Sequence, residues 1–349
     1  MVINLSDRLI HVMMKFDKNR VDHARVTLVS ASESLDPGYR LVVHIIHDNL
    51  SENDKTKLLD MTKLCENIHQ VNLYNFDEYI SKELQLDDYI SPRWGRTISF
   101  PLYESLILPN RVHRTIHLDE DLIINKSLHH LWIMDTFAPY IAVPELIPNN
   151  VLRYDIQDLD VLSVIPDFDP KKYTNCGVVV MNLDYVREHK LFDRYLELAR
   201  TGKFIWLEQS IFNVVYYDNT LNPGFEWNYP PMYEWERFTH SGRQLVYKYN
   251  EDNPDILDYM IKLKSNRSKI GIIHYYGWFK PWVIENDLDP VLRSYWVAAL
   301  DSLFYRLYDN NRDTVLNIEI SRYDMTKFEN WKELSTKEDL IRYYKLNIK

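Results

Sequence analysis

The first part of the chain alternates between apolar runs and stretches with helical periodicity. An amphipathic stretch over residues 21–34 follows the first run, and Ser51 with Asp54 opens another helix in the manner of a capping box. The runs have the length and composition of strands: residues 9–16, 39–48 and 69–76. Strand–helix alternation at this spacing predicts βαβ units and a mostly parallel sheet. The fold class is therefore α/β.

The pattern continues beyond these units and changes near the end of the chain. A helical stretch over residues 98–108 leads into a buried strand that ends at Asp119, and residues 222–233 resemble a loop or lid. Further elements are expected as strands at 140–145 and 175–183 and as helices at 184–201 and 208–217. Beyond Trp282 the pattern becomes helical and charge-balanced. We therefore expect a main domain over residues 1–283 and a helical appendage over 284–349.

Two buried strands end in residues that can form one metal site. Asp119 and Asp121 follow the first strand at positions i and i+2, so their carboxylates project from the same side. His274 ends the second, far along the chain. Ligands in open α/β sheets collect at the carboxyl ends of strands, where Asp17 and Asp48 are also expected. Carboxylates suit Mg²⁺ or Mn²⁺, and the imidazole favours Mn²⁺.

A phosphate-binding pattern lies close to the expected metal ligands. Gly277 permits close approach of the backbone to a phosphate, and Lys280 supplies a compact positive charge. Trp282 is better explained as a core or lid residue. A metal beside a diphosphate suggests a nucleotide-sugar transferase, because departure of the diphosphate needs compensation of its charge.

Composition narrows the partners and the compartment. The chain has 349 residues and a formal net charge of −10, which argues against nucleic acid as the main partner. The two cysteines form no CxxC motif, the N-terminus lacks the pattern of a signal peptide, and no apolar run is long enough to span a bilayer. We expect a cytoplasmic protein, with peripheral membrane association and oligomeric state left open. His129 and His130 are expected on opposite sides of a helix, which makes a poor metal clamp.

The order of motifs over residues 9–283 resembles glycosyltransferase family 8, which includes glycogenin and bacterial lipopolysaccharide galactosyl- and glucosyltransferases. The closing motif His-x-x-Gly-x-x-Lys-Pro-Trp matches residues 274–282 without a gap. A Trp-Asn segment matches Trp227 and Asn228. The other matching segments are Asp17-Lys-Asn19, Asp119-Glu120-Asp121, Ile141-Ala-Val-Pro-Glu145, Asn175-Cys-Gly177 and Glu208-Gln209.

The resemblance implies a GT-A-type, Rossmann-like sheet flanked by helices, and a site for a UDP-sugar. It places the metal on Asp119, Asp121 and His274. It assigns catalysis to Gln209, Glu208 and Lys280. Donor-binding residues would be Asp17, Asn19, Asp119, Glu120, Asp121, Glu145, Asn175, Gln209, His274, Gly277 and Lys280.

Two departures from the family pattern concern the donor sugar. The family usually has Asp where this chain has Glu208, whose side chain is longer by one methylene. An arginine typical of the helix before the DxD strand aligns near Ser105, and Arg96 is the candidate to replace it in space.

The expected function is Mn²⁺-dependent, retaining transfer of glucose or galactose from a UDP-sugar to a carbohydrate or lipid-linked acceptor, forming an α-linkage. Front-face return with Gln209 stabilising the cationic sugar is favoured, while Glu208 as a nucleophile or as a ligand of a sugar hydroxyl remains open. The alternatives are an inverting GT-A transferase, a non-catalytic sugar-binding protein of the same fold, and self-glucosylation on tyrosine.

Overall fold

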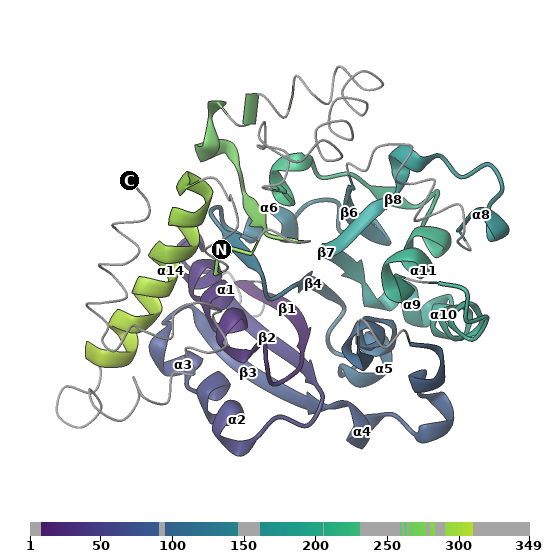
Figure 1. Ribbon diagram of the computed structural model, residues 1–349, viewed down its shortest axis with the longest axis horizontal. Coiled ribbons are helices and arrows are strands. Elements are labelled where there is room, and N and C mark those ends of the chain that lie inside the picture. Colours follow the sequence, from purple (N-terminus) through teal and green to yellow (C-terminus); the bar gives the residue numbers. More distant parts are fainter. Residues whose placement is uncertain are drawn as a thin grey trace, which may run out of the picture.

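A seven-stranded sheet forms the centre of the protein, as a computed structural model shows (Figure 1). The structure describes residues 8–90, 95–145, 161–204, 206–230, 259, 262–263, 265–276, 280–282 and 290–309. The strand order is β3-β2-β1-β4-β7-β6-β8. The strands are β1 (Leu9–Phe16), β2 (Arg40–His47), β3 (Ile68–Asn75), β4 (Arg114–Leu118), β6 (Tyr140–Pro144), β7 (Thr174–Asn182) and β8 (Thr220–Leu221).

Most neighbouring strands run parallel, as the sequence predicts. β1 pairs in parallel with β2 and β4, β2 pairs in parallel with β3, and β6 pairs in parallel with β8. β7 runs antiparallel to both of its neighbours, β4 and β6. The α/β class with a mostly parallel sheet is confirmed. Successive side chains of β1 enter different cores, since Val12 and Met14 pack on one face and Met13 on the other.

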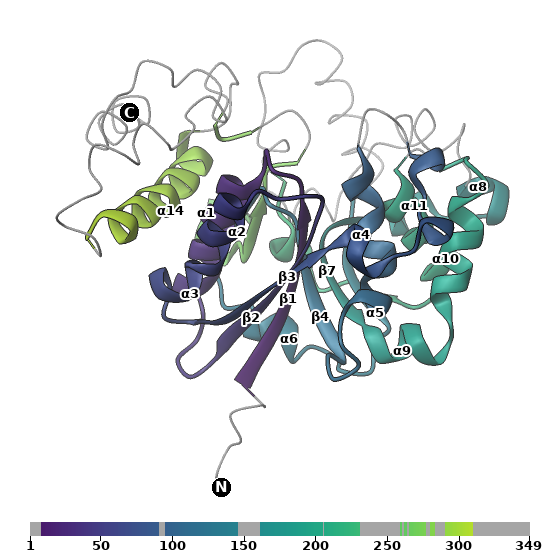
Figure 2. The same ribbon diagram turned by 90° about the horizontal axis from the view of Figure 1, so that it is seen from below.

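Helices cover both faces of the sheet (Figure 2). One face carries α1 (Val21–Glu33), α2 (Glu52–Leu59), α3 (Met61–Leu64) and α14 (Pro290–Asp309). The other carries α4 (Phe76–Tyr79), α5 (Glu104–Ile107), α9 (Leu183–Glu188), α10 (Leu191–Ala199) and α11 (Leu207–Val215). Short helices also form at α6 (His129–Trp132) and α8 (Val161–Val164). Ser51 caps α2 as expected, because its hydroxyl accepts the Asp54 N–H at 3.1 Å.

Two expected helices have a different form. Residues 96–103 form a 3₁₀ helix with Pro101 inside it, and the α-helical part is limited to α5. Proline has no N–H to donate and its ring clashes with the preceding turn, which explains the change. The helix expected over 184–201 divides into α9 and α10. Lys190 lies at the junction with a φ of 53°, which a continuous α-helix does not allow.

A second, two-stranded sheet connects distant parts of the chain. β5 (Leu122–Ile124) pairs antiparallel with β9 (Ile272–His274), and Leu122 lies opposite His274. This pairing holds the end of the second predicted strand beside Asp121. Short 3₁₀ turns at Phe225–Trp227 and Arg267–Lys269 flank β9, and Tyr229 bridges to Ile273.

The last described element packs on the main body of the protein. Leu292, Trp296 and Leu300 of α14 belong to the same hydrophobic cluster as α1. Arg306 pairs with Glu33 of α1 at 2.7 Å. The expected C-terminal helix is present, while the division at residues 283/284 stays a prediction. Within the residues described above, no helix combines the length and apolar character needed to cross a membrane.

Candidate active site

The two carboxylates and the imidazole expected to bind a metal lie together. Asp119 follows β4, and its N–H donates to the Gly177 carbonyl of β7 at 2.9 Å. The Asp121 carbonyl accepts the Tyr275 N–H at 3.0 Å, next to β9. As a result, His274 Nε2 lies 3.2 Å from Asp121 Oδ1 and 3.7 Å from Asp119 Oδ2. These three residues form a group whose ligand atoms all lie within 4.8 Å of one another.

A chain of two amide side chains, anchored by one backbone N–H, orients the imidazole ring of His274. The Gly177 N–H donates to Asn175 Oδ1 at 2.9 Å, so this atom must be the oxygen. The same oxygen accepts from Asn228 Nδ2 at 2.9 Å, which turns Asn228 Oδ1 toward His274 Nδ1 at 2.8 Å. An amide oxygen only accepts, so Nδ1 carries a hydrogen, and Nε2, which faces the two carboxylates, is the nitrogen available to bind a metal.

A cation fits between these groups. Asp121 Oδ1 is buried and faces His274 Nε2 at 3.2 Å. A buried carboxylate oxygen needs a positive charge beside it, which a proton on Nε2 or a metal ion between the two groups supplies. One imidazole nitrogen with two carboxylates is a donor set that divalent metals use in proteins. The residues therefore fit a bound divalent metal.

Gly177 has no side chain, which leaves room for His274 and Asp119 to lie close together. A Cβ added there would lie 2.1 Å from His274 Cε1 and 2.8 Å from Asp119 Oδ2. Real Cβ atoms do not approach other atoms so closely, so any larger residue would displace the imidazole or the carboxylate. The glycine of the Asn-Cys-Gly segment is thus required for space.

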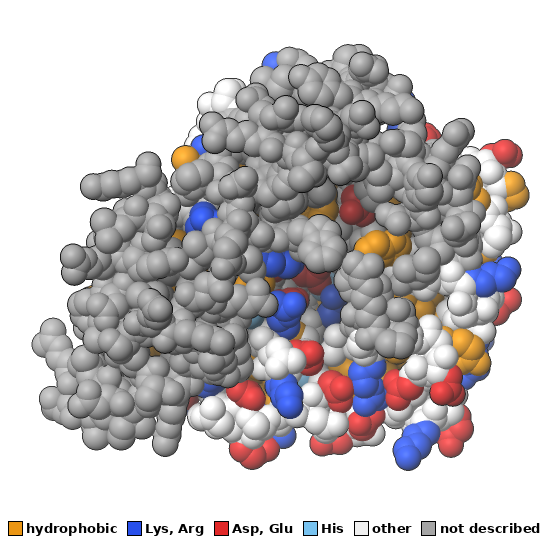
Figure 3. All heavy atoms as spheres, in the orientation of Figure 1, with side chains coloured by type: hydrophobic (Ala, Val, Ile, Leu, Met, Phe, Trp, Pro, Cys, Tyr) orange, Lys and Arg blue, Asp and Glu red, His pale blue; other side chains and the backbone are white. Residues whose placement is uncertain are grey.

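Each of the two aspartates in the candidate metal group has its own lysine. Lys280 Nζ donates to Asp121 Oδ2 and to the Tyr275 carbonyl, the latter at 2.8 Å. Lys15 Nζ, from the end of β1, donates to Asp119 Oδ1 at 2.9 Å. Burial opposes ionisation, but the lysines outweigh it and hold the pKa of both aspartates below its usual range. Acidic and basic side chains lie next to one another at the centre of the face in Figure 3.

The residues expected to bind sugar form a network that continues from His274. Asn175 Nδ2 donates to Gln209 Oε1 at 3.3 Å, and the Cys176 N–H donates to the same oxygen at 3.2 Å. Gln209 Nε2 therefore points away from them, and it donates to Glu145 Oε2 at 2.8 Å. The network joins α11, β7 and the end of β6 to the metal group. Glu145, Asn175 and Gln209 are brought together as the sequence predicts.

Glu208, the neighbour of Gln209 on α11, faces a different partner. Its Oε1 lies 3.9 Å from Lys15 Nζ, and its Oε2 is buried without a hydrogen-bond partner. Burial raises the pKa of Glu208 to about 8, although Lys15 lowers it. Lys15 thus lies between Asp119 and Glu208, and the two carboxylates keep the pKa of its ammonium above the usual range against burial.

The other expected donor-binding residues lie at the edge of this group or outside the described residues. Asp17 and Asn19 form a turn, in which the Asn19 N–H donates to Asp17 Oδ1 at 2.8 Å. Arg20, next along the chain, joins this turn to the DxD segment, since its Nε lies 3.5 Å from Glu120 Oε1. Burial raises the pKa of Glu120. Gly277 lies outside the described residues.

The replacement of the family arginine by Arg96 stays a prediction. Ser105 is buried on α5, and its carbonyl accepts from Arg187 Nε at 3.2 Å. Arg96 pairs with Asp77 at 2.7 Å and with Asp48 at 3.3 Å, beyond the ends of β2 and β3. The cation that contacts Asp119 is Lys15.

Sequence reasoning missed Lys15 and the role of Asn228. A lysine inside an apolar strand, as in Met13-Met-Lys15-Phe16, is a signal that could have been used, because a charge in a buried strand needs a partner. Asn228 was recognised only as part of the Trp-Asn segment, and nothing in the sequence indicated its contact with His274. Its contact with His274 joins positions 46 residues apart and depends on the packing of the loop before it.

Comparison with known proteins agrees with this geometry. A model of the family described as Glycosyl transferase family 8 matches residues 11–285. The chain belongs to glycosyltransferase family 8. Probable galacturonosyltransferase-like 10, a curated protein of Arabidopsis thaliana, is 24% identical to this chain over 298 residues. The match covers 78% of this chain and 76% of that protein.

Solved structures share the fold at lower identity. The apo structure of the bifunctional glycosyltransferase WbbM aligns with a TM-score of 0.64 and 16% identity over 88% of this chain, which spans only 51% of WbbM. The galactosyltransferase LgtC, solved with donor and acceptor sugar analogues, aligns with a TM-score of 0.58 and 18% identity over 84% of this chain and 96% of LgtC. The GT-A-type fold of this glycosyltransferase family 8 protein is confirmed.

Proposed function

We propose that this family 8 protein is a metal-dependent, retaining hexosyltransferase. It would move glucose or galactose from a UDP-sugar to a carbohydrate or lipid-linked acceptor and form an α-linkage. The observation that carries the proposal is the convergence of Asp119, Asp121 and His274 beside Lys280, with the Gln209 network directly behind them. We place this activity in the cytoplasm, with peripheral membrane contact left open.

Asp119, Asp121 and His274 would hold Mn²⁺, with Mg²⁺ as the alternative. The ion would supply Lewis-acid stabilisation of the charge that develops on the leaving diphosphate. Asn228 contributes by keeping the lone pair of His274 Nε2 directed at the ligand group. Lys280, which pairs with Asp121 when no metal neutralises that carboxylate, would be released to contact the diphosphate.

Lys15 would exchange partners in the same way. Once a metal neutralises Asp119, the remaining carboxylate near Lys15 is Glu208, which lies 3.9 Å away. Lys15 would then be the cation beside Glu208, and the comparison of donors described below distinguishes a neutral hexose from a hexuronic acid as the donor sugar.

The hydrogen bonds around Gln209 suggest how the two neighbouring residues divide their work. Gln209 Oε1 already accepts two hydrogen bonds, so its lone pairs are occupied and the side chain holds Glu145 and Asn175 in place. Glu208 has an unpartnered buried oxygen. We therefore assign Glu208 to contact with the donor sugar, near its reacting carbon, and Gln209 to positioning.

A hydrolysis screen with Mn²⁺ tests the proposal without knowledge of the acceptor. UDP-glucose, UDP-galactose and UDP-galacturonic acid would be compared, with release of UDP as the readout. One of the two neutral hexose donors should be turned over, and Asp121→Asn should abolish this activity. Asp193→Asn, on the exposed side of α10, should keep it. Wild-type turnover in Asp121→Asn would reject the site.

The stereochemical part of the proposal has its own readout. Proton NMR of the first sugar released should show the α-anomer before mutarotation. A β-anomer would support the inverting alternative instead. Glu208→Gln should lose more activity than Gln209→Ala, because removal of a contacting carboxylate costs more than loosening of a support.

A further inference from the structure

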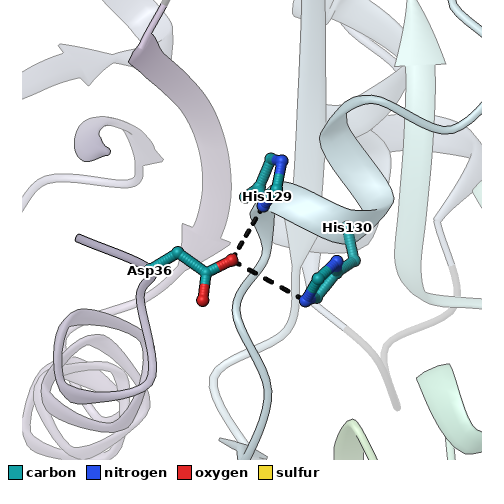
Figure 4. A group of neighbouring side chains, drawn as sticks. All are labelled: Asp36, His129 and His130. Atoms are coloured by element: carbon teal, nitrogen blue, oxygen red, sulfur yellow. Dashed lines mark hydrogen bonds and ion pairs between the residues drawn. The ribbon is translucent and has the colours of Figure 1, made fainter. Parts of the chain in front are cut away.

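A second group of side chains that could bind a metal lies at the amino ends of the strands, whereas the candidate active site lies at their carboxyl ends. Asp36 lies between α1 and β2, before the amino end of β2, whereas Asp119 follows the carboxyl end of β4. His129 and His130 begin α6, and both imidazoles turn toward the Asp36 carboxylate (Figure 4). The expectation that these histidines face opposite sides of a helix is wrong. α6 has only four residues, so no long helical surface separates the two side chains.

The three ligand atoms have nearly the separations that one metal ion requires. Asp36 Oδ2 lies 2.8 Å from His129 Nδ1 and 3.7 Å from His130 Nε2, and all three atoms lie within 4.8 Å of one another. Tetrahedral zinc with bonds of about 2.0–2.1 Å keeps its ligand atoms about 3.3–3.4 Å apart. The side chain of His130 is 52% exposed, so its ring has room for the small movement required.

The surroundings hold two of the ligands in place. Ser127 Oγ accepts the Asp36 N–H at 3.0 Å and the His129 N–H at 3.3 Å, which fixes both backbone segments to one side chain. Tyr39 stacks on the His129 ring with centroids 4.2 Å apart. His129 Nδ1 also forms a hydrogen bond with the Asp36 carboxylate.

A pair of one histidine and one aspartate elsewhere in the chain can be compared with the Asp36 cluster. His113 lies 2.8 Å from Asp184, the same distance as in the His129–Asp36 pair, and like His130 it is exposed. The metal-binding groups among the described residues do not include this pair, because no third ligand accompanies it. The addition of a second imidazole is therefore what separates the Asp36 cluster from an ordinary surface pair.

We propose that Asp36, His129 and His130 bind a second divalent transition metal ion, of the Zn²⁺ class, with water completing its coordination. Two imidazoles and one carboxylate are a nitrogen-rich set that suits Zn²⁺ better than Mn²⁺. The ion joins the loop after α1 to α6. The ion therefore stabilises the part of the protein at the amino ends of the strands, remote from the candidate active site. Its binding does not depend on the proposed transfer reaction.

Calorimetric titration of the full chain with Zn²⁺ tests this site. Asp121→Asn serves as the parent protein, so that the candidate active site lacks one of its ligands. His130→Ala in this parent should weaken the binding of one Zn²⁺ by at least about tenfold and should abolish the Zn²⁺-dependent rise in Tm. His130 is exposed, so its replacement leaves the fold intact.

His113→Ala in the same parent is the matched control, since it removes another exposed histidine that lies beside an aspartate. It should leave Zn²⁺ binding unchanged. In the parent, Zn²⁺ should also shift the ring-proton NMR signals of His129 and His130. Equal Zn²⁺ affinity in His130→Ala and the parent, or ring signals that do not respond to Zn²⁺, would overturn the proposal.

Discussion

At the scale of single residues, Lys15 and Lys280 act as internal counter-ions for the two carboxylates of the DxD segment. Each lysine contacts one aspartate, so the site without metal is already close to neutral. In the proposed function, a metal would displace the two ammonium groups from their aspartates. The affinity for metal would then depend on the lysines, which the exchange would release to contact the diphosphate and Glu208.

Lys15→Met tests this exchange. Loss of the positive charge beside Asp119 should strengthen Mn²⁺ binding by roughly tenfold, as expected for one charge removed at close range in a partly buried site. Turnover should fall at the same time, because Glu208 loses its counter-ion. Calorimetry gives the Mn²⁺ affinity and UDP release gives the rate. Lys55→Met, on α2, should change neither of them, and weaker Mn²⁺ binding in Lys15→Met would contradict the exchange.

At the scale of elements, Glu104 of α5 joins this short helix to β4 by accepting a hydrogen bond from Thr115. Glu104 is fully buried, and burial raises its pKa to about 7 from 4.5. The folded protein therefore keeps a proton that the unfolded chain loses at lower pH. The resulting contribution to stability is complete below the unfolded pKa and is lost as the pH rises through about 7.

Glu104→Gln keeps the hydrogen-bond acceptor and removes the charge. The free energy of unfolding of the variant minus that of the wild type should be more positive at about pH 8 than at about pH 5, by on the order of 2–3 kcal/mol. Urea unfolding at the two pH values measures it. The histidines are the same in both proteins, so their contributions to the pH dependence of stability cancel in the comparison. A difference that does not change with pH would show that Glu104 is charged in the folded protein.

The sequence predicted strands more accurately than helices. β1, β2 and β3 begin and end within a residue of the expected runs. Burial of nearly all of β2 leaves a long apolar signal, whereas β3 lies at the edge of the sheet and is only partly buried. The division at Lys190 was not predicted, since a left-handed lysine has no composition signal. The metal group was predicted because its residues follow strands in motifs. Asn228, Lys15 and the Asp36 cluster depend on packing between segments distant in sequence.

At the scale of the whole molecule, α14 connects the C-terminal part of the chain to the candidate active site. Trp296 is fully buried and packs against Trp282, with ring centroids 4.9 Å apart. Trp282 in turn packs on His23 of α1 and lies two residues after Lys280. The helix therefore supports the segment that carries the lysine as well as the face of α1.

Trp296→Ala should lower the free energy of unfolding by about 3–5 kcal/mol, the range for loss of a large buried aromatic side chain. It should also reduce turnover under conditions where the variant is folded, because the Lys280 segment loses its support. Tyr305→Ala, on the exposed side of the same helix, should change stability by no more than about 0.5 kcal/mol. Full stability in Trp296→Ala would show that α14 is a separate unit.

In the proposed function, Asp119, Asp121 and His274 would hold a metal ion on which binding of a nucleotide diphosphate depends. Calorimetric titration with UDP, with and without Mn²⁺, measures this dependence and needs neither sugar nor acceptor. UDP should bind the wild type only when Mn²⁺ is present, and Asp121→Asn should not bind it under either condition. Equal UDP affinity with and without Mn²⁺, or unchanged Mn²⁺-dependent binding in Asp121→Asn, would contradict this site.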